Sequence, residues 1–129
     1  MKWYQKLYIG KNVKKNRELL IKNVETGVGM PEVYLVTLAA NERDLFDIFR
    51  ADILFQPVLH GHCPLIVGAA KGWHEAVDIA TGIALDAYRK NGDFDVRKFL
   101  ESRIPDGEEM IYEYPMEKLK KRKLFRFGK

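Results

Sequence analysis

The sequence predicts a single α/β domain of three layers, with a mainly parallel sheet of about four strands between helices. Two nearly continuous apolar runs, at residues 33–40 and 63–70, have the length and composition of strands that are buried on both faces. Each run is followed by a polar turn and then by apolar residues at helical spacing. We therefore expect βαβ crossovers that join central parallel strands, with an edge strand at the C-terminal end of the domain.

The first elements follow from simple alternation. Residues 3–9 place Trp3, Leu7 and Ile9 on one face, which is typical of a strand that is covered on one side. The polar residues that follow end this strand, and residues 13–24, rich in Lys and Leu, predict a helix that ends near Gly27. We place the strand at residues 3–9 nearer the edge of the sheet than the two apolar runs.

A helix is predicted after the first apolar run. Asn41 is a good N-cap residue, and Asp44 lies three residues later, as in a capping box. The apolar side chains at positions 45, 46, 48 and 49 then fit a helix that stops at Gln56-Pro57. A shift of 31 positions superimposes this unit on the second one, with Asp44 over Glu75 and Val36 over Val67.

After the second apolar run, Lys71-Gly72 leads into a long predicted helix from Trp73 to about Lys90. Its expected inner stripe consists of Trp73, Ala76, Val77, Ala80, Ala84, Ala87 and Tyr88, and the many alanines indicate close approach to the sheet. Asp95 is the expected cap of a short helix that runs to Arg103. A turn follows, and residues 109–114 alternate as an edge strand should.

Charge is segregated along the chain, although the net charge is only +4. Residues 1–24 and 117–129 are each strongly basic, whereas residues 25–116 are acidic. We therefore divide the chain into one domain, residues 1–116, and a basic C-terminal tail, residues 117–129. The acidic middle part of the chain argues against a protein whose whole surface binds nucleic acid.

Nucleic-acid binding through the tail is one hypothesis. The bases Lys120, Lys121, Arg122 and Lys123 precede two phenylalanines, a composition able to contact phosphates and to stack on unpaired bases. The alternative is that the tail docks on the acidic surface of its own or a neighbouring subunit.

Localisation is predicted to be cytoplasmic. The single cysteine, Cys63, cannot form an internal disulfide, and the first residues lack the apolar core of a secretory signal. No apolar run approaches the length of a membrane span, so no membrane partner is expected.

An anion site is the main candidate for chemistry. Ligands of open parallel sheets collect beyond the carboxyl ends of the strands, where helix N-termini present free N–H groups. Lys11, Asn41, Lys71 and the Gly72 backbone are expected there and could hold a phosphate or a carboxylate. The same residues would also serve as ordinary turns and caps. The sequence contains neither a P-loop nor a G-x-G-x-x-G fingerprint, and we predict no cofactor.

Metal binding and nucleophilic catalysis have weaker candidates. His60 and His62 alternate beside Cys63, as two zinc ligands would, but the remaining ligands have no obvious source. The only serine, Ser102, lies outside any nucleophile elbow, and Cys63 reads more naturally as a small buried thiol. Asp47 and Asp78 suit the first turns of helices and a solvated face.

Three functions remain open at this stage. The first is a homo-oligomeric, non-enzymatic binding or regulatory module that associates through aromatic edge strands bearing Tyr4, Tyr8, Tyr112 and Tyr114. The second is a small enzyme or sensor for a phosphorylated or carboxylated metabolite bound at the strand ends. The third is nucleic-acid binding through the tail.

Overall fold

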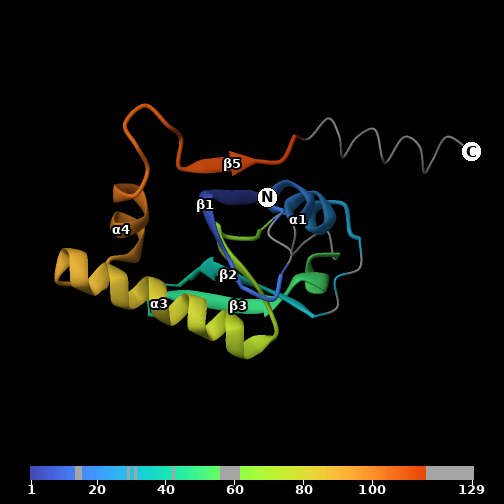
Figure 1. Ribbon diagram of the computed structural model, residues 1–129, viewed down its shortest axis with the longest axis horizontal. Coiled ribbons are helices and arrows are strands. Elements are labelled where there is room, and N and C mark those ends of the chain that lie inside the picture. Colours follow the sequence, from blue (N-terminus) through green and yellow to red (C-terminus); the bar gives the residue numbers. More distant parts are fainter. Residues whose placement is uncertain (14–15, 29, 31, 42, 56–61, 116–129) are drawn as a thin grey trace, which may run out of the picture.

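The fold is a mixed sheet with helices packed against it, seen in a computed structural model that describes residues 1–13, 16–28, 30, 32–41, 43–55 and 62–115 (Figure 1). The strands are β1 (Lys2–Ile9), β2 (Val33–Leu38), β3 (Phe46–Arg50), β4 (Ile66–Lys71) and β5 (Ile111–Glu113). The helices are α1 (Arg17–Glu25), α3 (Trp73–Asn91) and α4 (Val96–Ser102), with a 3₁₀ turn η1 (Ala51–Phe55). The prediction of an α/β fold is confirmed.

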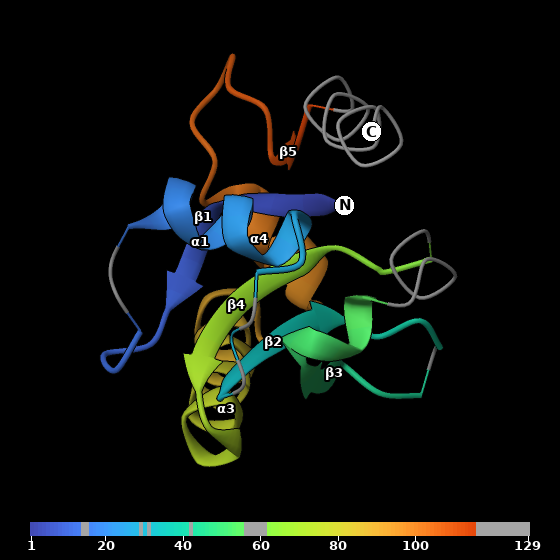
Figure 2. The same cartoon turned by 90° about the vertical axis from the view of Figure 1, so that its right-hand side faces the viewer.

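The strand order is β3-β2-β4-β1-β5, and the directions differ from the prediction (Figure 2). β1 and β4 are parallel, but β2 runs antiparallel to both β3 and β4, and β5 runs antiparallel to β1. The expectation of a mainly parallel sheet of about four strands is therefore wrong. In particular, β2 and β4 are not joined by a βαβ crossover, because they are antiparallel and residues 46–50 between them form a strand.

The predicted helix after Asn41 is this hairpin strand, β3. Phe46 and Ile48 pack with the core on one face, whereas Phe49 joins the core on the other face. The same apolar residues fit helical spacing and strand alternation, so periodicity alone could not separate the two. Aromatic and β-branched residues favour a strand when a partner is available, and β2 supplies one along its whole length.

The remaining elements lie close to their predicted positions. α1 begins at Arg17 rather than near residue 13, because the Asn16 side chain caps it by accepting a hydrogen bond from the Leu19 amide at 3.1 Å. Asp95 caps α4 as expected, accepting from the Lys98 amide at 3.1 Å. β5 is an edge strand, as predicted.

The inner stripe of α3 is narrower than predicted. The buried side chains are Ala76, Ala80, Ile83 and Ala87, at the spacing of one helix face. Trp73 and Tyr88, at the two ends of the helix, are about half exposed. Trp73 contacts Tyr34 edge-to-face, and Tyr88 stacks on Phe94, so each ring packs locally instead of entering the core.

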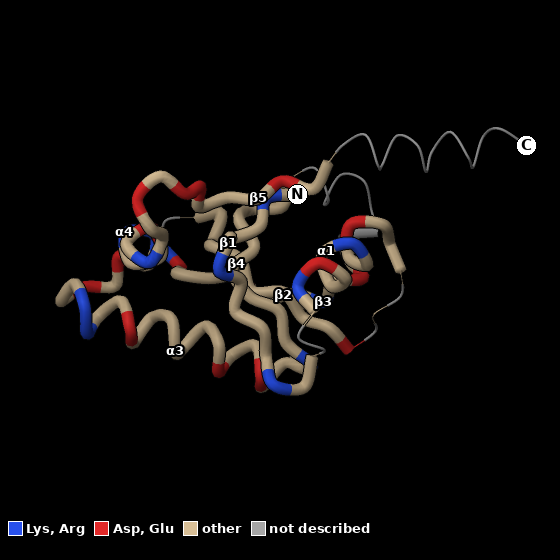
Figure 3. The backbone as a smooth tube through the Cα atoms, turned by 45° about the horizontal axis from the view of Figure 1, so that its top comes forward, with Lys and Arg blue, Asp and Glu red and all other residues tan. Residues whose placement is uncertain are grey.

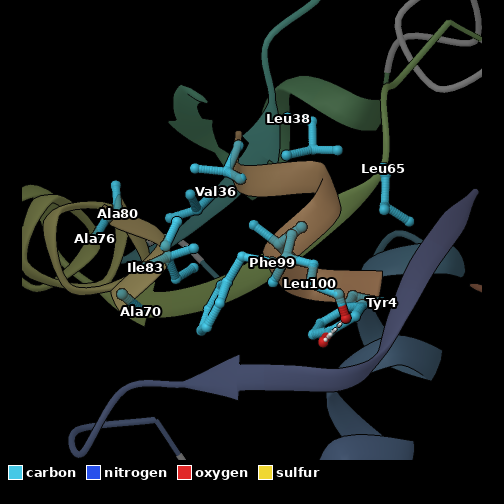
Figure 4. Close-up of a cluster of buried hydrophobic side chains, with 13 residues drawn as sticks. Tyr4, Val36, Leu38, Leu65, Ala70, Ala76, Ala80, Ile83, Phe99 and Leu100 are labelled. Carbon is cyan, nitrogen blue, oxygen red and sulfur yellow. Dashed lines mark hydrogen bonds between the residues drawn. The ribbon is translucent and has the colours of Figure 1, made fainter. Parts of the chain in front are cut away.

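Hydrophobic side chains form two clusters, one on each face of the sheet. On one face, α3 and α4 cover β1, β2 and β4 (Figure 4). There the Tyr4 hydroxyl donates a hydrogen bond of 2.7 Å to the Leu100 carbonyl, which ties β1 to α4. On the other face, α1 packs Leu20, Ile21 and Val24 over the sheet. In the described part of the chain, no helix is long and apolar enough to cross a membrane.

Candidate functional site

Four strand ends meet at one end of the sheet. β1 and β4 are parallel, and the Gly10 amide donates to the Ala69 carbonyl at 2.8 Å, so the turn after β1 lies beside the end of β4. Since β2 is antiparallel to β4, its first residues lie here too, with Val33 opposite Lys71. The end of β3 completes the group, because Arg50 pairs with Tyr34.

The Glu75 carboxylate occupies the niche where β1 and β4 end. One of its oxygens accepts a hydrogen bond of 2.6 Å from the Asn12 side chain, and the other accepts from the Lys71 amide at 3.2 Å. A Cβ at Gly10 would lie 1.6 Å from the Glu75 Oε1, so only glycine leaves room for the carboxylate. The chain therefore fills with its own carboxylate the backbone niche in which the sequence predicts a bound anion.

Gly72 joins this end of the sheet to α3. It adopts φ +85°, a conformation that L side chains rarely take, and its amide donates to the Glu32 carbonyl at 2.8 Å. This bond holds the segment before β2 against the N-cap of α3. Gly72 is the N-cap of α3 and provides no side-chain cap, and the Glu75 side chain reaches back from the first turn of α3 to the Lys71 amide.

A pocket of about 620 Å³ opens beside this niche, within the size range of small-molecule sites. It is lined by Asn12, Glu32, Tyr34, Arg50, Lys71, Gly72 and Trp73. The Tyr34 and Trp73 rings meet edge-to-face with centroids 6.2 Å apart and form its apolar wall. Among the described residues, the charged side chains that line the pocket are Glu32, Arg50 and Lys71, and each of the two cations has a carboxylate partner.

The charged groups of the pocket are held in exposed ion pairs. The Lys71 ammonium lies 3.3 Å from a Glu32 carboxylate oxygen, and both side chains are more than half exposed. Arg50 pairs with Asp52, whose hydrogen bond raises the pKa of the guanidinium. Exposed ion pairs are screened by solvent and contribute little to stability, so a ligand anion can replace the carboxylate partner at small cost.

The structure places the predicted site residues at two opposite ends of the sheet, because β2 runs antiparallel to β4. Lys71 and Gly72 line the pocket, and Lys11 is exposed in the turn after β1, where its neighbour Asn12 is the lining residue. Asn41 was wrongly grouped with them, because β2 is antiparallel to β4 and its carboxyl end lies at the opposite end of the sheet. There its side-chain oxygen accepts from the amides of Arg43 and Asp44, both at 2.9 Å.

The sequence analysis did not predict five of the lining residues, which are Asn12, Glu32, Tyr34, Arg50 and Trp73. Asn12 could have been included with Lys11, since both belong to the same turn. Arg50 and Tyr34 reach the pocket only because β2 and β3 form a hairpin, so no local pattern marks them. Trp73 was assigned to the helix core on its spacing, and its exposed fraction of 52% instead places it at the surface.

The weaker chemical candidates lie away from this pocket. Among the described residues, no group of three or more His, Cys, Asp or Glu side chains could hold a metal ion. His62 is exposed, and His60 lies outside the described residues. Burial raises the pKa of the partly buried Cys63 thiol to about 11, so little thiolate is present near neutral pH. Ser102 donates its hydroxyl hydrogen bond to the Phe99 carbonyl within α4.

The tyrosines proposed as an association surface are engaged within the chain. Tyr4 and Tyr114 are buried. Arg103 donates to the Tyr8 hydroxyl and lies over its ring, and burial raises the pKa of both Tyr4 and Tyr8. The Arg17 guanidinium lies 5.3 Å from the centroid of the Tyr112 ring. The basic tail residues Lys120, Lys121, Arg122 and Lys123 lie outside the described residues.

Acidic residues recur along α3, and the basic residues of this helix lie at its C-terminal end (Figure 3). The outer side of α3 therefore does not extend the basic lining of the pocket, which is confined to the strand ends.

Comparison of the chain with protein-family models, with curated proteins and with solved structures finds no significant match.

Proposed function

We propose that this domain binds a small anionic metabolite, carrying a carboxylate or a phosphate, in the pocket at the ends of β1, β3 and β4. Lys71 and Arg50 would contact the negative group, and Tyr34 and Trp73 would cover an apolar part of the molecule. The observation that carries the proposal is the convergence of two exposed cations and two aromatic rings on one pocket. Three separate segments of the chain, at Tyr34, Arg50 and residues 71–73, supply these groups.

We propose binding rather than covalent catalysis. Neither Cys63 nor Ser102 lines the pocket, and the Glu75 carboxylate is already engaged by Asn12 and the Lys71 amide. The lining residues offer charge and aromatic contacts, which supply affinity and orientation. A sensor or regulatory module would need no more than this.

The proposal is tested by measuring binding of inorganic phosphate, citrate and a set of nucleotides. Trp73 is half exposed in the pocket, whereas Trp3 is fully buried, so a change in tryptophan emission reports mainly on Trp73. We expect a saturable change with at least one anion, which Lys71→Gln and Arg50→Gln each weaken about tenfold through loss of a charge-assisted contact. Lys98→Gln, an exposed lysine on α4, is the matched control and should leave binding unchanged.

Absence of any saturable change across the set, confirmed by calorimetry, would refute the proposal. Equal binding by the wild type and by the Lys71→Gln/Arg50→Gln double variant would also refute it, because the anion would then lie elsewhere.

Homo-oligomerisation, nucleic-acid binding and a cytoplasmic location stay predictions. Tyr4 and Tyr114 are buried, so these two side chains do not form an exposed aromatic surface for self-association. Sedimentation of the full chain tests self-association, and deletion of residues 117–129 tests the contribution of the tail to nucleic-acid affinity.

A further inference from the structure

A second depression adjoins the pocket and is mainly apolar. It has a volume of about 490 Å³ and lies between α1, the turn after β1 and the start of β2. Its apolar lining residues are Val13, Leu19, Leu20, Met30 and Val33. We call it the α1 groove. Leu19, outside the buried face of α1, lines the groove and is 44% exposed, so an apolar side chain is accessible to a ligand there.

The α1 groove and the anion pocket form one continuous depression. Asn12, Glu32 and Lys71 line both of them. Among the described lining residues of the α1 groove, the charged ones are Glu32 and Lys71, at the end that it shares with the pocket, and the polar ones outside that end are the neutral amides Asn16 and Asn23. A molecule that lies in both parts would need its charge at one end and an apolar body at the other.

We propose that the ligand is a monomeric amphiphile, with an unbranched apolar chain in the α1 groove and a terminal carboxylate at Lys71. The inference rests on the anionic function proposed above and specifies the class of molecule. The sign of the headgroup follows from Lys71, the described cation that lines both depressions and whose exposed carboxylate partner, Glu32, a ligand carboxylate can replace. The ligand carboxylate would replace the Glu32 carboxylate as the partner of the Lys71 ammonium.

The apolar contribution can be measured with a homologous series of n-alkyl carboxylates, from acetate to decanoate, each below its micelle-forming concentration. Burial of a methylene is worth about 0.8 kcal/mol, so the affinity should rise about three- to fourfold for each carbon until the groove is filled. Binding is followed by amide chemical shifts and by Trp73 emission.

Three variants separate the two ends of the ligand. Leu19→Ser should flatten the dependence on chain length and leave the shortest carboxylates unaffected. Lys71→Gln should weaken every member by a similar factor and keep the slope, and Glu32→Gln should strengthen every member by removing a competing carboxylate. Leu85→Ser on α3 is the control for Leu19→Ser, because Leu85 is exposed to the same degree, 43%, and does not line the groove.

The possible outcomes separate this inference from the proposed function. If phosphate or acetate binds and chain length has no effect, the amphiphile is wrong and the anion pocket stands. If no anion of either set binds, both are wrong. Equal binding of alkylammonium ions, a slope that Leu85→Ser changes and Leu19→Ser does not, or binding only to anionic phospholipid vesicles would each overturn the amphiphile assignment.

Discussion

Two turns with the same sequence plan behave differently in this molecule. One follows β2 and contains Asn41 and Asp44, and the other follows β4 and contains Gly72 and Glu75. After the first, the chain reverses into a strand, and after the second it enters a helix of 19 residues. The polar side chains of the first turn bond within the turn, whereas Glu75 reaches across to Asn12 in the turn after β1.

The difference shows how the second turn contributes to the pocket described above. A carboxylate that bonds within its own turn satisfies local amides and brings no other segment near. Glu75 instead joins two parallel strand ends, and Gly10 gives it space to do so. The antiparallel β2–β3 hairpin then adds Tyr34 and Arg50 to the same end. A site arises where chain segments from distant parts of the sequence are bonded to one another.

The largest expected effect is on the free energy of unfolding, and it compares a core residue of α3, the helix after the second turn, with one of β3, the strand after the first turn. Ile83 on α3 is fully buried, so Ile83→Ala should cost about 2–5 kcal/mol in the free energy of unfolding. Ile48 on β3 is only partly buried, and Ile48→Ala should cost about 1–2 kcal/mol. Urea denaturation measures both. A larger loss for Ile48→Ala would show that the hairpin, and not α3, carries the core.

The reactivity of the Cys63 thiol tests whether the end of the sheet near the first turn carries a nucleophile. It lies just before β4, and burial raises the pKa of its thiol from 9.0 to about 11. Its reaction with a disulfide reagent at pH 8 should therefore be about ten- to a hundredfold slower in the native protein than in urea. Rapid labelling of the native protein would contradict this burial.

The same shift in pKa has a consequence for stability. The folded thiol holds its proton more tightly than the unfolded one, so this contribution is present below pH 9 and is lost as the pH rises towards 11. The raised pKa values of Tyr4 and Tyr8 act in the same direction. Cys63→Ala should therefore lose less stability over this alkaline range than the wild type does.

Gly10→Ala tests the bridge that distinguishes the second turn. The added methyl group would displace the Glu75 carboxylate from Asn12 and from the Lys71 amide, at a cost of about 1–3 kcal/mol. In the Gly10→Ala/Glu75→Ala double variant the clash is absent, so the glycine substitution should cost much less there. Additive costs in the denaturation cycle would mean that Glu75 does not lie over Gly10.

Asn41→Ala should have the smallest effect. Its side chain accepts two amide hydrogen bonds in an exposed hairpin turn, and loss of such a cap costs about 0.5–1 kcal/mol. Ligand binding should be unchanged, because this turn lies at the other end of the sheet. If Asn41→Ala weakened the binding of phosphate or alkyl carboxylates, the site would lie at the first turn and our assignment would be wrong.

The sequence was sufficient to predict elements whose signals are local. The buried strands β2 and β4, the long helix α3 and the cap at Asp95 each follow from residues within or beside the element. Strand direction could not be predicted, because it depends on whether residues 46–50 form a helix or a strand, and their apolar spacing fits both. The same ambiguity hid the antiparallel pairing of β2 with β3 and β4, which determines the position of Asn41 relative to Lys71.

Only part of the candidate site could be predicted for the same reason. Lys71 and Gly72 follow a strand directly, so they were found, whereas Arg50 and Tyr34 depend on hairpin pairing. The Glu75 contact with Asn12 joins residues 63 positions apart, and no periodicity in the sequence reports on such a contact.

The most direct test of the site is the set of amide chemical shifts in the ¹⁵N-labelled full chain during titration with sodium octanoate. We predict saturable changes at Asn12, Tyr34, Arg50 and residues 71–73, together with Leu19, and no change at residues 41–44. Changes centred on residues 41–44, or no saturable change anywhere, would contradict the assignment of binding to the end of the sheet where β1 and β4 finish.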